Sequence, residues 1–119
     1  MKLFRFDPVM PITQFGSMNV VAAPVMRNDI GIQVVWMRLD AGGRLGNHQA
    51  VKNQLFIVTS GNGWVQTENG DKTTVTVGQA AFWQSGEWHE SGTETGMMAL
   101  IIEGDAIDLP NIAPQRNST

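Results

Sequence analysis

Short apolar runs separated by turn residues follow one another along most of the chain. In residues 31–39, which are rich in β-branched and aromatic side chains, Val35, Met37 and Leu39 alternate with Trp36 and Arg38. Similar runs occupy residues 19–26, 54–60, 64–67, 73–77, 79–83, 87–92 and 97–103, which gives seven to nine expected strands. No segment has a helical period. The pattern therefore predicts an all-β sandwich or barrel.

Glycine and asparagine mark the expected connections between these strands. Residues 40–46 (DAGGRLG) predict a glycine-rich connection, and residues 60–63 (SGNG) predict a tight turn. Residues 68–71 (ENGD) separate two alternating runs, and Asn-Gly in that position is a strong hairpin signal. Most of the barrel is thus expected to consist of short strands, each antiparallel to the next.

The length of 119 residues is that of one compact domain. Residues 1–17 contain two prolines and no sustained period, which predicts an N-terminal arm packed on the domain or on a partner subunit. We expect the barrel to span residues 18–104. Residues 105–119, with two prolines and polar ends, are expected to form an extended tail.

Charge and cysteine content exclude several classes of function. The net charge is −3, and the 8 lysines and arginines are scattered, so the basic stripe that nucleic acids require is missing. The same balance disfavours binding to anionic membranes. The lack of cysteine excludes disulfides, thiol nucleophiles and cysteine-ligated metals. No apolar run has the length of a leader or a membrane span, and we expect a cytoplasmic protein.

Two histidines limit the metal chemistry that one subunit can offer. His48 follows the glycine-rich segment, and His89 follows the turn that starts at Ser85. A centre with three histidines cannot form within one chain. The two rings are separated by about 40 residues, or two hairpins, so they can meet across a barrel.

The spacing around both histidines resembles the two sequence motifs of the cupin family. Gly42, His48, Gln54 and Gly61 have the spacing of the first motif, a glycine, five residues, H-x-H, three or four residues, Glu, six residues and Gly. Gly78, the Gln84-Ser85-Gly86 segment and His89 match the second motif. The resemblance covers residues 42–92 and implies a cupin double-stranded β-helix, a jelly-roll barrel that buries its ligand between two sheets.

The resemblance also implies a divalent metal, and the chain departs from the family at its ligands. Members of the family hold the ion with two histidines and a glutamate from the first motif and one histidine from the second. The corresponding positions here are His48, Ala50, Gln54 and His89, and Gln84 replaces a proline. An amide donates less charge than a carboxylate, so His48, Gln54 and His89 predict a weak site for iron, manganese, nickel or zinc. A structural alternative is that the histidines are unrelated turn residues.

Four further residues are candidates for the wall of a ligand pocket. Phe56 shares a strand face with Gln54, and Trp83 and Trp88 lie near His89 in the sequence. Glu87 is a candidate for an additional metal ligand. Glu90, the residue after His89, is expected to point away from the face of His89, because neighbours on a strand alternate. The non-functional alternatives are that the tryptophans pack in the core or at an interface and that Glu87 is a solvated loop carboxylate.

Three functions are compatible with these residues. The first is a module that binds a small polar or aromatic molecule in the barrel, directly or through a weak divalent metal site. The second is a metal-dependent cupin enzyme, a dioxygenase or isomerase that acts on a small acid. The third is a purely structural dimer whose pocket is filled by side chains. Because Leu55 and Ile57 alternate with Phe56 and Val58, both faces of one strand are apolar, which predicts a homodimer.

Overall fold

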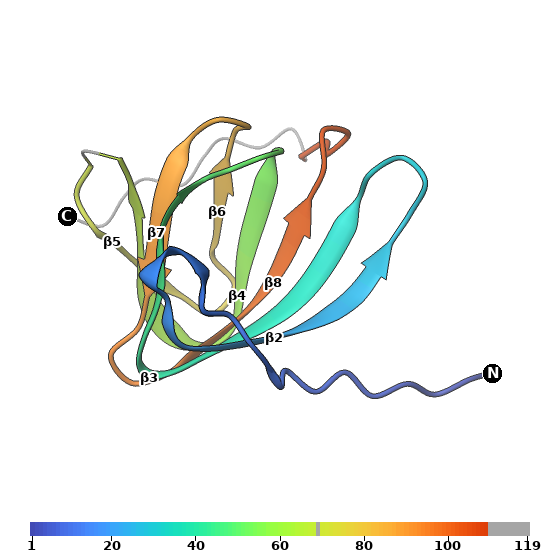
Figure 1. Cartoon of the computed structure of the whole chain (residues 1–119), viewed down its shortest axis with the longest axis horizontal. Coiled ribbons are helices and arrows are strands. Elements are labelled where there is room, and N and C mark those ends of the chain that lie inside the picture. The colour runs from blue at the N-terminus through green and yellow to red at the C-terminus, as the bar shows by residue number, and fades with distance from the viewer. Residues whose placement is uncertain (69, 110–119) are drawn as a thin grey trace.

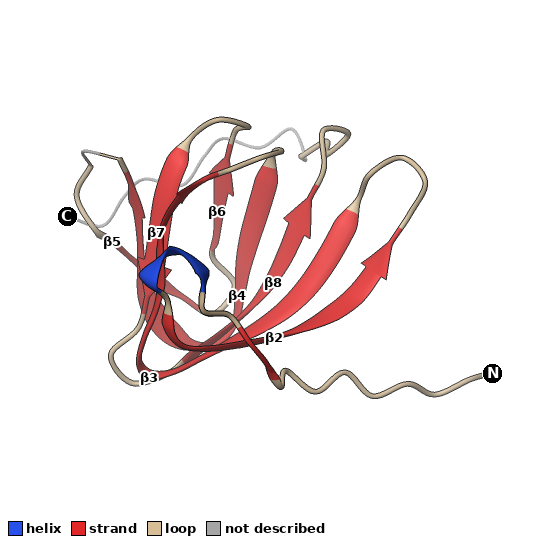
Figure 2. Ribbon diagram, viewed as in Figure 1, coloured by secondary structure: helices blue, strands red, loops and turns tan. Residues whose placement is uncertain are grey.

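The chain folds into a curved array of antiparallel strands, seen in a computed structural model that describes residues 1–68 and 70–109 (Figure 1). In chain order the elements are β1 (Met10–Pro11), the 3-10 turn η1 (Gln14–Gly16), β2 (Met18–Arg27), β3 (Gln33–Gln49), β4 (Gln54–Thr67), β5 (Thr73–Thr76), β6 (Ala80–Trp83), β7 (Trp88–Gly92) and β8 (Met97–Glu103). The all-β class predicted from the hydrophobic pattern is confirmed (Figure 2). Asn69, in the predicted hairpin turn, and residues 110–119 of the predicted tail lie outside the described residues.

Two strands are longer than the sequence pattern predicts. Residues 40–46 lie within β3, and residues 60–63 lie within β4, so the expected connection and the expected tight turn are both wrong. Gly42 and Gly61 have φ values of 75° and 73°, which let each strand bend without ending. Glycine in these positions marks a bend inside a strand, although it reads as a turn in the sequence.

The bends let each long strand pair with different neighbours along its length. The first half of β3 pairs with β2 and β8, and its second half pairs with β7 and, at Arg44, with Met18 of β2. The first half of β4 pairs with β6 and β8, and its second half pairs with β5 and β7. The strands consequently curve around one interior, as a jelly-roll barrel requires (Figure 1).

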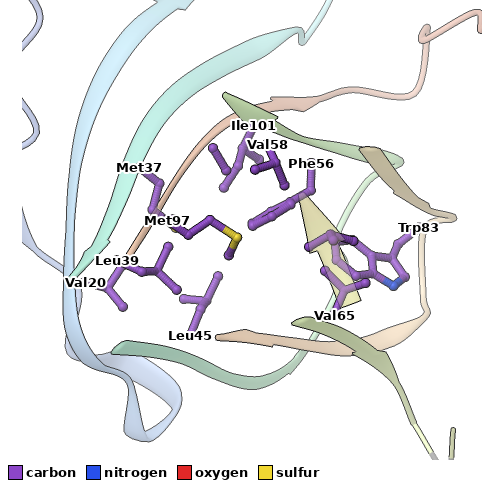
Figure 3. Close-up of a cluster of buried hydrophobic side chains, with 12 residues drawn as sticks. Val20, Met37, Leu39, Leu45, Phe56, Val58, Val65, Trp83, Met97 and Ile101 are labelled. Atoms are coloured by element: carbon purple, nitrogen blue, oxygen red, sulfur yellow. The ribbon is translucent and has the colours of Figure 1, made fainter. Parts of the chain in front are cut away.

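Alternate residues of the strands fill that interior. Met37 and Leu39 from β3, Phe56 and Val58 from β4, and Met97 and Ile101 from β8 belong to one buried cluster (Figure 3). Leu39, Phe56 and Val58 are almost completely buried. Apart from the exposed Arg38, the outer face of the same strands carries partly exposed apolar residues, namely Trp36, Leu55, Ile57, Leu100 and Ile102.

The N-terminal segment lies at the edge of the sheet. Met10 and Pro11 pair with β2, and η1 follows directly. Residues 1–7 extend away from the barrel, and Leu3 and Phe4 are strongly exposed (Figure 1). In the described part of the chain, no helix has the length and hydrophobicity needed to cross a membrane.

Candidate functional site

His48 and His89 lie side by side on neighbouring strands. They are direct partners in the pairing of β3 with β7, and their ring centroids are 4.2 Å apart at an angle of 56°. His89 is only 1% exposed, whereas His48 is partly exposed. The register of the two motifs therefore brings together the two histidines as the sequence predicts.

The two imidazoles are the centre of a row of four rings. Phe15 stacks on His48 with a centroid distance of 4.6 Å and an angle of 11°. On the other side, Trp83 stacks on His89 at 4.3 Å and 20°. The sequence placed Trp83 near His89, but it did not predict Phe15, which lies 33 residues before His48 and comes from the N-terminal arm.

Phe15 is held over His48 by hydrogen bonds between the arm and β3. Its φ of 61° is unusual for a bulky residue. The amide of Gly46 donates to the Ser17 hydroxyl at 3.0 Å, and Arg44 donates to the Gly16 carbonyl at 3.3 Å. A side chain at Gly46 would collide with the carbonyl oxygen of Phe15. The glycine at position 46 is thus what allows the arm to approach the site.

Backbone carbonyls orient both imidazoles. Nδ1 of His48 lies 2.7 Å from the Gly46 oxygen, and Nδ1 of His89 lies 3.3 Å from the Glu87 oxygen. A carbonyl only accepts hydrogen bonds, so each contact requires the proton on Nδ1. In a neutral ring with that tautomer, Nε2 keeps a lone pair for a metal or for a hydrogen-bond donor.

The position of His89 keeps its ring neutral. Burial, reinforced by the charge of nearby His48, lowers the pKa of His89 from 6.5 to about 4, although its hydrogen bond with the Glu87 carbonyl acts in the opposite direction. Within the described residues, its Nε2 is buried without a hydrogen-bond partner, as is the hydroxyl of Ser91, two positions along the same strand. Unpartnered buried polar atoms are uncommon and mark a place where a donor would be stabilised.

A cavity of about 290 Å³ opens beside His48. Its wall is mainly apolar and is formed by Ile12, Phe15, Val35, Met37, Leu45 and Ile101. Four polar side chains join this wall, namely Gln14, His48, Gln54 and Glu103. An apolar hollow with a few convergent polar groups is the usual form of a small-molecule site, and this one is at the small end of the range.

Gln54 and Glu103 form a pair within the cavity wall. They are direct partners in the pairing of β4 with β8, and Nε2 of Gln54 donates to Oε1 of Glu103 at 2.6 Å. Gln54 is 6% exposed, and Glu103 is partly exposed. A carboxylate is therefore present beside the amide that replaces the glutamate of the resembled motif, but it comes from the last strand. Sequence reasoning missed Glu103 because no motif includes it.

Comparison with known protein families finds one match, and it spans the residues of this site. A family model described as "Cupin domain" matches residues 35–103, which include both histidines, Gln54 and Glu103. The chain belongs to the cupin family. Among curated proteins, none has a sequence that matches it.

Solved structures agree on the cupin fold. A cupin-like protein from Thermotoga maritima superimposes with a TM-score of 0.77 at 17% identity, over 89% of this chain and 83% of the other. A predicted oxalate decarboxylase from the same organism gives 0.72 at 20% identity, over 82% and 90%. The polyketide cyclase RemF from Streptomyces resistomycificus gives 0.76 at 15% identity, over 88% and 80%. Identities this low show a shared fold.

The remaining predicted pocket residues of this cupin lie around the histidines and outside the wall of the 290 Å³ cavity. Phe56 is buried in the core with its ring centroid 6.0 Å from that of Trp83, and Trp83 itself packs on His89. Trp88 is 39% exposed. The carboxylate of Glu87 accepts a hydrogen bond from the backbone N–H of Gln84 at 3.0 Å. Phe56 and Trp83 thus have a packing role, and Glu87 caps the turn before β7.

Proposed function

We propose that this cupin binds a small polar or aromatic molecule in the cavity beside His48. The observation that carries the proposal is the composition of the wall, in which His48 and Gln54 converge on a hollow that is otherwise mostly apolar. The apolar side chains remove the ligand from water, and the polar groups orient it. The ring of His89 packs against the ring of His48.

Binding is tested by protein-observed NMR with benzyl alcohol, a small neutral aromatic probe. We expect shift changes for residues that line the cavity, such as His48, Gln54 and Ile101, and none for Lys72, which packs on Trp64 in the region where β4 pairs with β5. His48→Ala should weaken the response, whereas Asn47→Ala, at an exposed neighbour, should leave it unchanged. Shifts confined to the outer surface would overturn the proposal.

A divalent ion is the second candidate ligand, and the unpartnered Nε2 of His89 favours it. The ring is neutral at pH 7, which is the form that binds metals. Among the described residues, however, no cluster of three or more His, Asp or Glu side chains is arranged for an ion. Two imidazoles and the amide oxygen of Gln54 fit an ion that also keeps waters or an exogenous anion, which predicts weak binding.

A bound ion would supply Lewis-acid chemistry, which the rival hypothesis of a dioxygenase or isomerase for a small acid requires. Metal analysis of protein purified without chelator, followed by titration with manganese, nickel and zinc, tests this candidate. Gln54→Glu should tighten binding because it restores a carboxylate, and Ala50→His should add an imidazole. Equally tight binding by the wild type and by the double variant with Gln54→Glu and Ala50→His would show that another group completes the wild-type site. Glu87 is the first candidate for that group.

A further inference from the structure

The polar groups of the cavity differ from those expected of a site for acids. Of the described residues that line it, none is a lysine or an arginine. The ion pairs of the described chain join Arg5 to Asp7, Arg38 to Asp40 and Arg44 to Glu90, so no basic side chain of residues 1–68 and 70–109 forms an ion pair with Glu103. Within the described part of the chain, the carboxylate of Glu103 thus brings to the cavity wall a negative charge that is not held in an ion pair.

The neighbours of Glu103 leave it able to accept more hydrogen bonds. Gln54 donates one hydrogen bond to Oε1, and a carboxylate has two oxygens with about four acceptor sites. Its side chain is only partly exposed, so water screens it incompletely. A donor that enters the cavity can therefore form a charge-assisted hydrogen bond with this group.

His48, a second polar group of the wall, also accepts. His48 directs Nδ1 to the Gly46 carbonyl, which leaves Nε2 as an acceptor in the neutral ring. Phe15 lies beside it and supplies an aromatic ring in the same wall. The cavity consequently combines these two acceptors, one of them charged, and the neutral amides of Gln14 and Gln54 with aromatic and aliphatic surface.

We propose that the cavity selects a small organic amine, with its ammonium group at Glu103 and its apolar body against Phe15 and Ile101, and that it rejects carboxylates. This inference rests on the proposed binding function and names the class of ligand. An ammonium group has three donors and a positive charge, so it matches both Glu103 and the oxygen of Gln54. A carboxylate would meet the charge of Glu103 without a basic partner.

The test compares three probes of similar size, benzylamine, benzyl alcohol and benzoate, at about pH 8, where benzylamine is still largely protonated. EDTA is present so that no metal can hold the acid. Calorimetry gives the affinities, and NMR shows whether each probe reaches the cavity. We expect benzylamine to bind at least about tenfold more tightly than benzoate, the order of one charge-assisted hydrogen bond.

Glu103→Gln separates the charge from the shape of the cavity. The amide can still accept the hydrogen bond from Gln54, so the wall is preserved, and the preference for benzylamine over benzoate should fall to within about threefold. Glu94→Gln is the control, because Glu94 is exposed in the connection between β7 and β8. It should leave the preference unchanged.

The outcomes distinguish the two proposals. Benzoate that binds in the cavity as tightly as benzylamine, or a Glu103→Gln effect no larger than that of Glu94→Gln, would overturn the amine preference while the binding function stands. If none of the three probes shifts cavity resonances, the binding function fails, and the amine preference fails with it.

Discussion

Burial of His89 makes the stability of the fold depend on pH in a defined window. The pKa of this ring is 6.5 in an ordinary environment and about 4 in the folded protein, lowered first by burial and second by the charge of His48. Between these values the unfolded chain binds more protons than the folded chain. The free energy of unfolding is therefore fully retained above about pH 6.5 and decreases as the pH falls toward 4.

The size of the effect follows from the same two values. At about 1.4 kcal/mol per pKa unit, the difference corresponds to an upper limit of about 3 kcal/mol, a large part of the stability of a small domain. Because carboxylates also titrate near pH 4, the informative quantity is the difference between wild type and His89→Gln. Between pH 7 and pH 4, we expect the wild type to lose up to about 3 kcal/mol more of its free energy of unfolding than His89→Gln loses.

Urea unfolding at half-unit pH steps, followed by tryptophan fluorescence, measures this difference. His48→Gln serves as the matched control in the neighbouring ring. This variant should narrow the pH range over which stability is lost, because removing the charge of His48 allows the pKa of His89 to rise toward its ordinary value. A wild-type minus His89→Gln difference that stays constant from pH 7 to pH 4 would refute the reasoning.

Three further predictions concern the arm and the outer surface. Gly46→Ala should lower the stability by about 1–3 kcal/mol in thermal or urea unfolding, since its side chain would collide with the backbone of Phe15, whereas Asn47→Ala should have little effect. Phe15→Ala should increase the solvent exposure of His48, seen as faster modification of the ring by diethyl pyrocarbonate, and an unchanged rate would contradict the stacking. The apolar outer face predicts a homodimer; sedimentation at micromolar concentration should give about twice the mass of 13.0 kDa. Leu100→Lys should reduce that mass, and a wild-type monomer would remove the prediction.

The sequence by itself determined the class of fold and the pairing of the two histidines. Alternation of apolar residues specifies which strand faces are buried, and that information is local. The spacing of Gly42, His48, Gln54 and His89 was sufficient to predict the cupin register, and His48 and His89 are indeed partners across β3 and β7. The turns assigned at residues 40–46 and 60–63 failed because a glycine with positive φ permits a bend as readily as a chain reversal.

Only the tertiary structure decided what surrounds the histidines. Phe15 reaches His48 because the arm packs against Gly46, and Glu103 reaches Gln54 across 49 residues because β8 lies between β3 and β4. Neither contact leaves a periodic or motif signal in the sequence. The low pKa of His89 is likewise a product of burial by the assembled barrel. A strand pattern states which way a side chain points, whereas the identity of its neighbours depends on how distant strands come together.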